Sequence, residues 1–141
     1  MRYSLHSRAS RPIDSGAEHL TSQTERGPHY SPFIRGAGLI FTSGQLPLRP
    51  GRDTSLASAS FKEQAQQALA NLQSVLGDAG ADLSHVVKTT VYLSDMADWP
   101  ELDKVYGQFF GAARPARSVV PTGPLHFGFR IEIEAIALAS D

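Results

Sequence analysis

The segment from Ser60 to Gly80 constrains the fold more than any other part of this 141-residue chain. Ser60 and Glu63 form a Ser-x-x-Glu capping box, in which each side chain binds the backbone N–H of the other residue at the start of a helix. Apolar residues then follow at helical spacing, namely Phe61, Ala65, Ala68, Leu69, Leu72, Val75, Leu76 and Ala79. Gly80 ends the pattern. The segment is therefore predicted to be an amphipathic helix.

Strand patterns lie on both sides of this helix. Residues 33–36 and 39–43 are short β-rich runs around a glycine-containing turn, and they are predicted to form a hairpin. Residues 46–58 contain several Pro and Gly breakers and are predicted to be a loop. Residues 86–93 are rich in β-branched side chains and form a predicted strand. Its expected core-facing side carries Val87, Thr89, Val91 and Leu93.

A second helix and two more strands complete the pattern. Asp98 is predicted to cap a helix that ends before Gly111. The apolar stripe of this helix is predicted to face the core and consists of Trp99, Leu102, Val105, Tyr106, Phe109 and Phe110. Residues 118–120 and 129–138 are β-rich runs separated by a Pro-Thr-Gly-Pro loop. This order predicts an α+β domain, in which a mixed β-sheet carries two helices on one face. The uncovered face of such a sheet favours association with another subunit.

Composition excludes several classes of function. The chain has no cysteine, which excludes disulfides, thiolate nucleophiles and cysteine metal sites and favours a cytoplasmic location. The five histidines lack the spacing of a metal site, and no phosphate-binding glycine loop occurs, so we expect neither metal nor cofactor. A formal net charge of −1 argues against nucleic-acid binding. No apolar run approaches the roughly 20 residues of a membrane helix.

Residues 1–29 differ from the remainder of the chain. They are rich in Ser, Arg, Thr, Gln and His and show no periodic apolar pattern. We expect a poorly ordered N-terminal extension here, followed by one domain over residues 30–141. The arginines weakly resemble a transit peptide, but the segment lacks a good amphipathic face and contains Asp14, Glu18 and Glu25.

The residues with catalytic potential are one arginine and two acids. Arg117 lies at the entry of a predicted strand, and Glu132 and Glu134 lie on the last strand, on the same face as Arg130. The spacing alone is more typical of a solvated edge or an intersubunit salt bridge. The functional interpretation is an arginine that binds a carboxylate with its bidentate fork beside a glutamate that handles a proton.

Five segments resemble the signature of the Rid family, the YjgF-type reactive-intermediate deaminases. They are Gly-Pro-His-Tyr-Ser-Pro at 27–32, Phe-Thr-Ser-Gly-Gln at 41–45, Val-Lys-Thr-Thr-Val-Tyr-Leu at 87–93, Arg-Pro-Ala-Arg-Ser at 114–118 and Ile-Glu-Ile-Glu-Ala-Ile-Ala at 131–137. Each fragment is weakly specific alone, but the combination is highly specific. The resemblance extends over nearly all of the chain beyond the N-terminal extension.

The resemblance implies a fold, an assembly and an activity. Members of this family adopt a chorismate-mutase-like (YjgF-like) α+β domain and form homotrimers with an active site in each intersubunit cleft. Members with the arginine of the Pro-Ala-Arg-Ser motif hydrolyse reactive enamines and imines, such as 2-aminoacrylate and 2-iminopropanoate, to a 2-keto acid and ammonia without a cofactor. A cofactor-free imine deaminase that acts on a small-molecule imine or enamine acid is therefore expected.

The resemblance also implies roles for individual residues. Arg117 matches the arginine that holds the substrate carboxylate, and Glu132 matches the acid proposed to position or activate the hydrolytic water. Tyr30 matches a tyrosine near the mouth of the cleft, and Ser43 and Gly44 match the contacts of the hairpin with the substrate. The alternative for these three residues is a packed ring and a capped turn.

Several positions depart from the family pattern and leave the substrate open. His29 is inserted next to Tyr30, Asp103 stands where many of these deaminases have Asn, and Val119 replaces a cysteine. Together with Phe-Gly-Phe at 127–129, these changes leave a bulkier or less anionic imine as an alternative substrate. We expect Asp103 and Val119, like Tyr30, to contact the substrate.

Two other functions are attributed to proteins of this family. One is an endoribonuclease or translation inhibitor, against which the near-neutral charge argues. The other is a non-catalytic trimer that binds a small ligand, as in branches that lack the arginine. The presence of Arg117 disfavours this second alternative.

Overall fold

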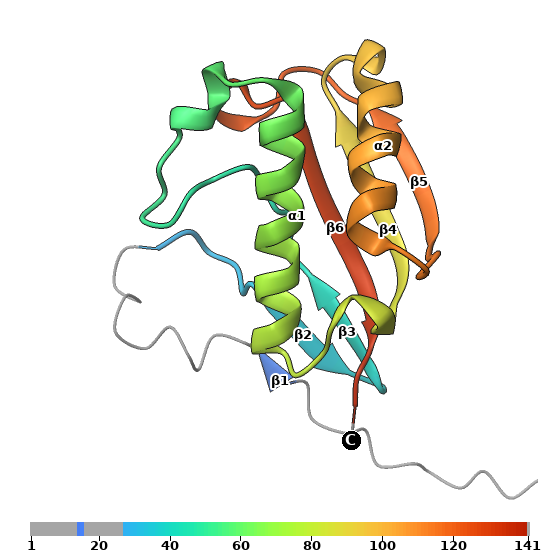
Figure 1. The fold of residues 1–141 in the computed structure, drawn as a ribbon. Coiled ribbons are helices and arrows are strands. Elements are labelled where there is room, and N and C mark those ends of the chain that lie inside the picture. Colours follow the sequence, from blue (N-terminus) through green and yellow to red (C-terminus); the bar gives the residue numbers. More distant parts are fainter. Residues whose placement is uncertain (1–13, 16–26, 141) are drawn as a thin grey trace, which may run out of the picture.

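Two helices, α1 (Phe61–Asp78) and α2 (Trp99–Phe110), lie over one face of a mixed sheet (Figure 1). The computed structural model describes Asp14–Ser15 and residues 27–140. Within these residues the strand order is β1-β2-β3-β6-β4-β5. The strands are β1 (Asp14–Ser15), β2 (Phe33–Gly36), β3 (Leu39–Thr42), β4 (Val86–Leu93), β5 (Ala116–Pro121) and β6 (Ile131–Leu138). Only the β4–β5 pair is parallel among them, so the predicted mixed α+β sheet with two helices on one face is confirmed.

Helix α1 begins at the predicted capping box. Ser60 N donates to Glu63 Oε2 over 3.2 Å, and Glu63 N donates to Ser60 Oγ over the same distance. The helix ends where Gly80 takes a φ of +82°, a conformation that glycine adopts without steric cost. These local signals explain why the prediction of this helix is correct.

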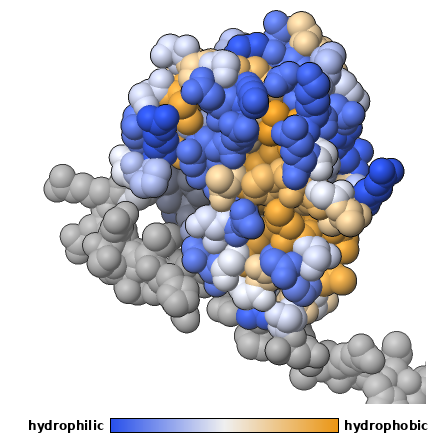
Figure 2. Space-filling model, viewed as in Figure 1, coloured by the Kyte–Doolittle hydropathy of each residue, from blue (hydrophilic) through white to orange (hydrophobic). Residues whose placement is uncertain are grey.

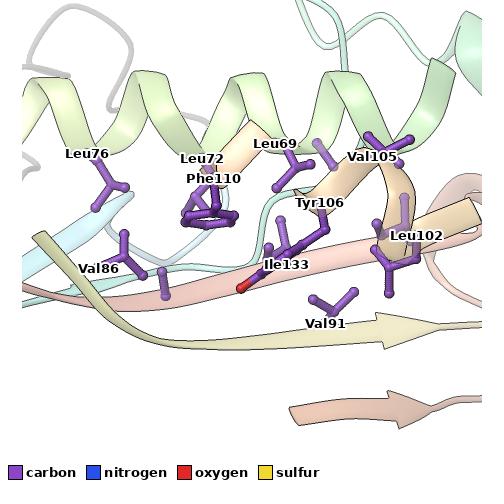
Figure 3. Close-up of a cluster of buried hydrophobic side chains, with 14 of the residues drawn as sticks. Leu69, Leu72, Leu76, Val86, Val91, Leu102, Val105, Tyr106, Phe110 and Ile133 are labelled. Atoms are coloured by element: carbon purple, nitrogen blue, oxygen red, sulfur yellow. The ribbon is translucent and has the colours of Figure 1, made fainter. Parts of the chain in front are cut away.

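The core lies between the helices and the sheet. Side chains of α1 and α2 pack onto β4 and β6, as seen in Figure 3 for Leu69, Leu72, Leu76, Val86, Val91, Leu102, Val105, Tyr106, Phe110 and Ile133. Apolar residues also gather between the two helices, while hydrophilic residues occupy their outer sides (Figure 2). Burial on this face leaves the other face of the sheet without a covering element among the described residues.

The prediction that Val87 faces the core is wrong. A β-bulge lies between Val86 and Lys88 in the pairing with β6, so Val86 is buried and Val87 is 40% exposed. From Thr89 onward the alternation follows the prediction, with Thr89, Val91 and Leu93 buried. The bulge sets which residues of β4 face the helices.

Asp98 lies at the predicted N-cap position of α2, but its side chain makes no capping hydrogen bond. Its carboxylate instead pairs with Arg130, whose Nε donates to Oδ2 over 3.0 Å and whose Nη2 donates to Oδ1. A bidentate pair of this kind is geometrically specific. It fixes the residue before β6 against the start of α2.

Strand β1 was not predicted. Asp14 pairs with Arg35 and Ser15 pairs with Ile34, which places β1 antiparallel to β2 at one edge of the sheet. Of the predicted poorly ordered extension, residues 1–13 and 16–26 lie outside the described residues, so that interpretation stays a prediction.

Gln64 provides a test of how the start of β6 is held. It is fully buried, its Oε1 accepts from Arg130 N over 2.9 Å, and its Nε2 donates to the carbonyls of Ala57 and Ala59 over 3.4 and 3.2 Å. Gln64→Leu leaves these backbone groups without partners, so we expect the free energy of unfolding to fall by about 1–3 kcal/mol. Urea denaturation measures the loss.

The matched control is Gln66→Leu, because Gln66 is exposed on the same helix. It should change the free energy of unfolding by less than about 0.5 kcal/mol. Equal midpoints for the two variants would show that the contacts of Gln64 contribute nothing to stability.

Candidate functional site

Arg117 lies within β5 on the side of the sheet that α2 covers. It pairs with Thr89 of β4. Its guanidinium carbon lies 4.7 Å from the ring centre of Tyr106 and 5.6 Å from that of Trp99. Its Nη2 donates to Asp103 Oδ1 over 3.0 Å. Aromatic rings and a carboxylate thus hold a planar cation in one place, while a fifth of its side chain remains exposed.

Tyr106 forms the base of this arrangement. Its hydroxyl shares a 2.8 Å hydrogen bond with Thr89 Oγ1 and points toward the sheet (Figure 3). Burial raises the pKa of Tyr106, although the hydrogen bond with Thr89 and the charge of Arg117 act in the opposite direction. The phenol therefore stays neutral at physiological pH and supports the guanidinium as a rigid, uncharged surface.

Glu132 lies on β6 and projects from the other face of the sheet. It pairs with Tyr92 of β4, whereas Arg117 pairs with Thr89 of the same strand. Side chains three residues apart on a strand point to opposite faces. The structure therefore does not bring Arg117 and Glu132 together within one chain.

Gly44 has no side chain and so leaves room for the carboxylate of Glu132. A Cβ atom built on Gly44 would collide with Glu132 Oε1. The two segments are held together by a pair of backbone hydrogen bonds, Gln45 N to Ile133 O at 2.7 Å and Ile133 N to Gln45 O at 3.0 Å. Any side chain at position 44 would displace the carboxylate of Glu132.

The carboxyl group of Glu132 is partly withdrawn from water. Burial raises its pKa above the ordinary value of 4.5, and the nearby charge of Glu134 raises it further. A protonated His126 lowers the pKa in part. A raised pKa makes the carboxyl group a better proton acceptor than an ordinary glutamate.

Ser43 precedes Gly44 and therefore lies close to this acid. Ser43 Oγ donates to Ser31 O over 2.6 Å, and Ser43 N donates to Pro32 O over 2.9 Å. Ser43 thereby ties the segment that carries Tyr30 to the end of β3. The ring of Tyr30 is 60% exposed.

The predicted site residues thus form two groups. The Arg117 group contains Arg117, Asp103 and Val119, the last of which packs on the core two residues further along β5. The Glu132 group contains Ser43, Gly44 and Glu132, and Tyr30 lies one residue before Ser31, to which Ser43 is hydrogen-bonded. Each group is contiguous in space, but the two lie on opposite faces of the sheet.

Sequence reasoning did not include Trp99 and Tyr106 in the site, because their spacing predicted a core stripe on α2. Tyr106 does lie in the core, but its ring and that of the exposed Trp99 also flank Arg117. The sequence did contain a signal for these two residues, because positions 99, 103 and 106 lie on one face of a helix. The combination of two aromatic residues and one acid on that face indicates a site for a cation.

The open face of the sheet also carries polar pairs. Lys88 Nζ donates to Ser118 Oγ over 3.0 Å, and the Tyr92 hydroxyl donates to Glu134 Oε1. The bond to Glu134, with burial, raises the pKa of Tyr92 to about 12. A hollow of about 200 Å³ lies between Phe41, Lys88 and Glu134, and neither Arg117 nor Glu132 lines it.

Two further findings bear on function. Among residues 14–15 and 27–140, no group of three or more His, Asp or Glu side chains is arranged to hold a metal ion. No helix in the described part of the chain is long and apolar enough to cross a membrane.

Comparisons with known proteins agree on one family. The family described as endoribonuclease L-PSP matches residues 22–139. A RutC family protein of Sinorhizobium fredii, y4sK, is 44% identical over 110 residues, which cover 78% of this chain and 86% of that protein. Reactive Intermediate Deaminase A, chloroplastic, of Arabidopsis thaliana is 40% identical over 118 residues, which cover 81% of this chain and 63% of that protein.

Solved structures share the fold. The crystal structure of TdcF of E. coli with bound serine superposes with a TM-score of 0.72 at 32% identity, over 82% of this chain and 91% of that chain. The expected YjgF-like fold is therefore confirmed. Because one relative is named as chloroplastic, the expected cytoplasmic location stays a prediction.

The raised pKa of Glu132 predicts how stability depends on pH. The folded chain binds the proton of Glu132 more tightly than the unfolded chain, so this contribution to stability is complete below pH 4.5 and is lost as pH rises through the raised pKa. Glu132→Gln removes the titrating group. We therefore expect the free energy of unfolding of the variant to increase relative to that of the wild type as pH rises from 4 to about 7.

Urea denaturation at a series of pH values, at one protein concentration, measures the difference. A constant difference between wild type and variant across this range would contradict the raised pKa of Glu132.

Proposed function

Because the chain belongs to the Rid (YjgF, endoribonuclease L-PSP) family, we propose that it is a hydrolytic deaminase of reactive enamine and imine acids. Arg117 is the observation that carries this proposal. Its guanidinium is held by Tyr106 and Asp103 with part of its surface open, as a site for a substrate carboxylate requires. One relative is named a reactive intermediate deaminase, and the structure of TdcF holds serine, a small molecule with a carboxylate.

The active site in this proposal is assembled between chains. Arg117 and Glu132 lie on opposite faces of the sheet, so the Arg117 group of one chain meets the Glu132 group of a neighbour. Cyclic association into a homotrimer provides three such sites. The open face of the sheet, which includes the exposed side chain of Phe41, supplies the surface for this association.

The chemistry requires only an anchored carboxylate and a positioned water. Arg117 holds the carboxylate of a 2-imino acid, and Glu132 accepts a proton from water as the water oxygen bonds to the imine carbon. Glu132 then returns the proton to the nitrogen, which gives a carbinolamine. In a second transfer Glu132 takes the proton of the new hydroxyl and passes it to the amino group, so that the C–N bond breaks, ammonia leaves and the oxygen lone pair forms the keto group. One imine and one water thus give one 2-keto acid and one ammonia, with no cofactor.

Asp103 limits how the substrate can bind. It occupies Nη2 of Arg117, so a substrate carboxylate binds through the remaining N–H groups of the guanidinium. The carboxylate of Asp103 is largely exposed and carries a negative charge beside this position. It therefore disfavours substrates with a second negative charge.

The alternatives have less support. An endoribonuclease, the activity for which the family is named, would bind a polyanion, and the formal net charge of −1 offers little electrostatic attraction. A non-catalytic trimer would not need Arg117 and Glu132. The deaminase is therefore the function we propose for this chain.

Arg117→Lys tests the proposal. Lysine keeps the positive charge but lacks the planar fork, so we expect imine hydrolysis to fall by roughly 100-fold or more. The free energy of unfolding should change by only about 0–1 kcal/mol, because the ion pair with Asp103 is partly exposed. Ammonia release from imines made by an amino-acid oxidase measures activity, and thermal melting measures stability.

Arg114→Lys is the matched control, since Arg114 is exposed three residues before Arg117. It should leave both activity and stability near those of the wild type. Near-normal turnover by Arg117→Lys would show that Arg117 has only a structural role.

A further inference from the structure

Phe127 has an unusual backbone conformation. It lies in the 3-10 turn η5 (His126–Gly128) with a φ of +61°, in the left-handed region that bulky side chains rarely adopt. Among the described residues other than glycine, Ala37 and Arg52 share a positive φ, and both lie in turns. Backbone strain at a bulky residue persists only where the surrounding structure imposes it, and such positions gather at functional sites.

The ring of Phe127 is exposed yet supported. It is 43% exposed, although a phenyl ring would ordinarily be buried. The rings of Phe127 and His126 have centres 3.8 Å apart, and Phe127 meets the buried ring of Phe129 edge to face at 6.1 Å. Such contacts fix the orientation of the ring. Phe127 therefore presents a rigid apolar surface to the outside of the chain.

The loop that carries this ring is anchored at both ends. Thr122 N donates to Leu93 O over 2.9 Å at its start. Ser94 N donates to Arg130 O over 3.2 Å at its end. Both bonds attach the loop to the residues at the end of β4, so the position of Phe127 is set by the sheet.

This surface lies beside the Glu132 group. The turn η5 leads directly into β6, which carries Glu132. His126, whose ring meets that of Phe127 edge-on, is close enough for its charge to lower the pKa of the carboxyl group of Glu132. The acid that handles the water in the proposed mechanism thus has an aromatic surface next to it.

We propose that Phe127, supported by His126 and Phe129, binds the side chain of the substrate, and that the chain acts on 2-imino acids with large apolar or aromatic side chains. This inference rests on the proposed deaminase function and adds its substrate class. The exposed ring of Trp99 beside Arg117 supplies an apolar surface on the other half of the site. The reaction converts R–C(=NH)–COO⁻ and water to R–C(=O)–COO⁻ and ammonia, where R is the bulky group.

The test compares imines made by an amino-acid oxidase from alanine, leucine and phenylalanine. We expect kcat/KM of the wild type for the leucine and phenylalanine imines to exceed that for the alanine imine by about tenfold or more, because a pocket that fits added methylenes discriminates to this extent. Phe127→Asn should reduce this ratio by about tenfold. Phe127→Tyr keeps the ring and should retain the ratio.

Asparagine is chosen because it adopts a positive φ more readily than Phe. The Tm of Phe127→Asn should therefore stay unchanged or rise, which separates loss of the ring from loss of folding. Val87→Ala is the control, since Val87 is an exposed apolar residue at the opposite end of β4 and should leave the ratio unchanged.

Three results would overturn the inference. The first is a wild-type preference for the alanine imine. The second is a Phe127→Asn variant that hydrolyses all imines more slowly by the same factor. The third is dissociation of the assembly of this variant, measured by light scattering, which would make Phe127 a subunit contact. Absence of turnover on every imine would instead refute the deaminase function. In that case calorimetry with pyruvate and phenylpyruvate still decides whether Phe127 selects an aromatic group, and equal affinities for the two would overturn that role.

Discussion

Strand β6 is the element on which the other parts of the structure depend. It pairs with β3 on one side and β4 on the other, and it therefore joins the hairpin to the parallel pair β4–β5. Its alternate residues Ile131, Ile133, Ala135 and Ala137 are buried beneath the helices. A one-residue shift of this strand would move these four buried side chains to the open face and both glutamates into the core. The register of β6 is thus strongly fixed.

The same alternation determines how the chain can function. It places Glu132 on the face that no described element covers, next to Gly44, while Arg117 lies under α2 against Tyr106. A substrate that needs both groups can meet them only where two chains come together. The proposed function therefore makes assembly a condition of catalysis, because Arg117 and Glu132 do not share a face within a single chain.

The fold could largely be predicted from the sequence because its signals are local. The capping box at Ser60 and the alternation around Glu132 depend only on neighbouring residues. Two features could not be predicted, because each depends on a distant partner. The first is the bulge that exposes Val87, which follows from the pairing of β4 with β6. The second is the hydrogen bond from Arg130 to the carboxylate of Asp98, since 32 residues separate the two in the sequence. Likewise, Tyr106 fits a core stripe on α2, and only the packing of α2 onto β5 reveals its contact with Arg117.

The central claim is that Arg117 and Glu132 act together across a subunit boundary, and subunit mixing tests it most directly. Arg117→Lys and Glu132→Gln chains are each expected to form inactive assemblies. When equal amounts are unfolded and reassembled together in a trimer, roughly a quarter of the sites combine an intact Arg117 from one chain with an intact Glu132 from its neighbour. Imine hydrolysis should then recover to about a quarter of the wild-type rate. A mixture that remains as inactive as the two separate variants would contradict the account.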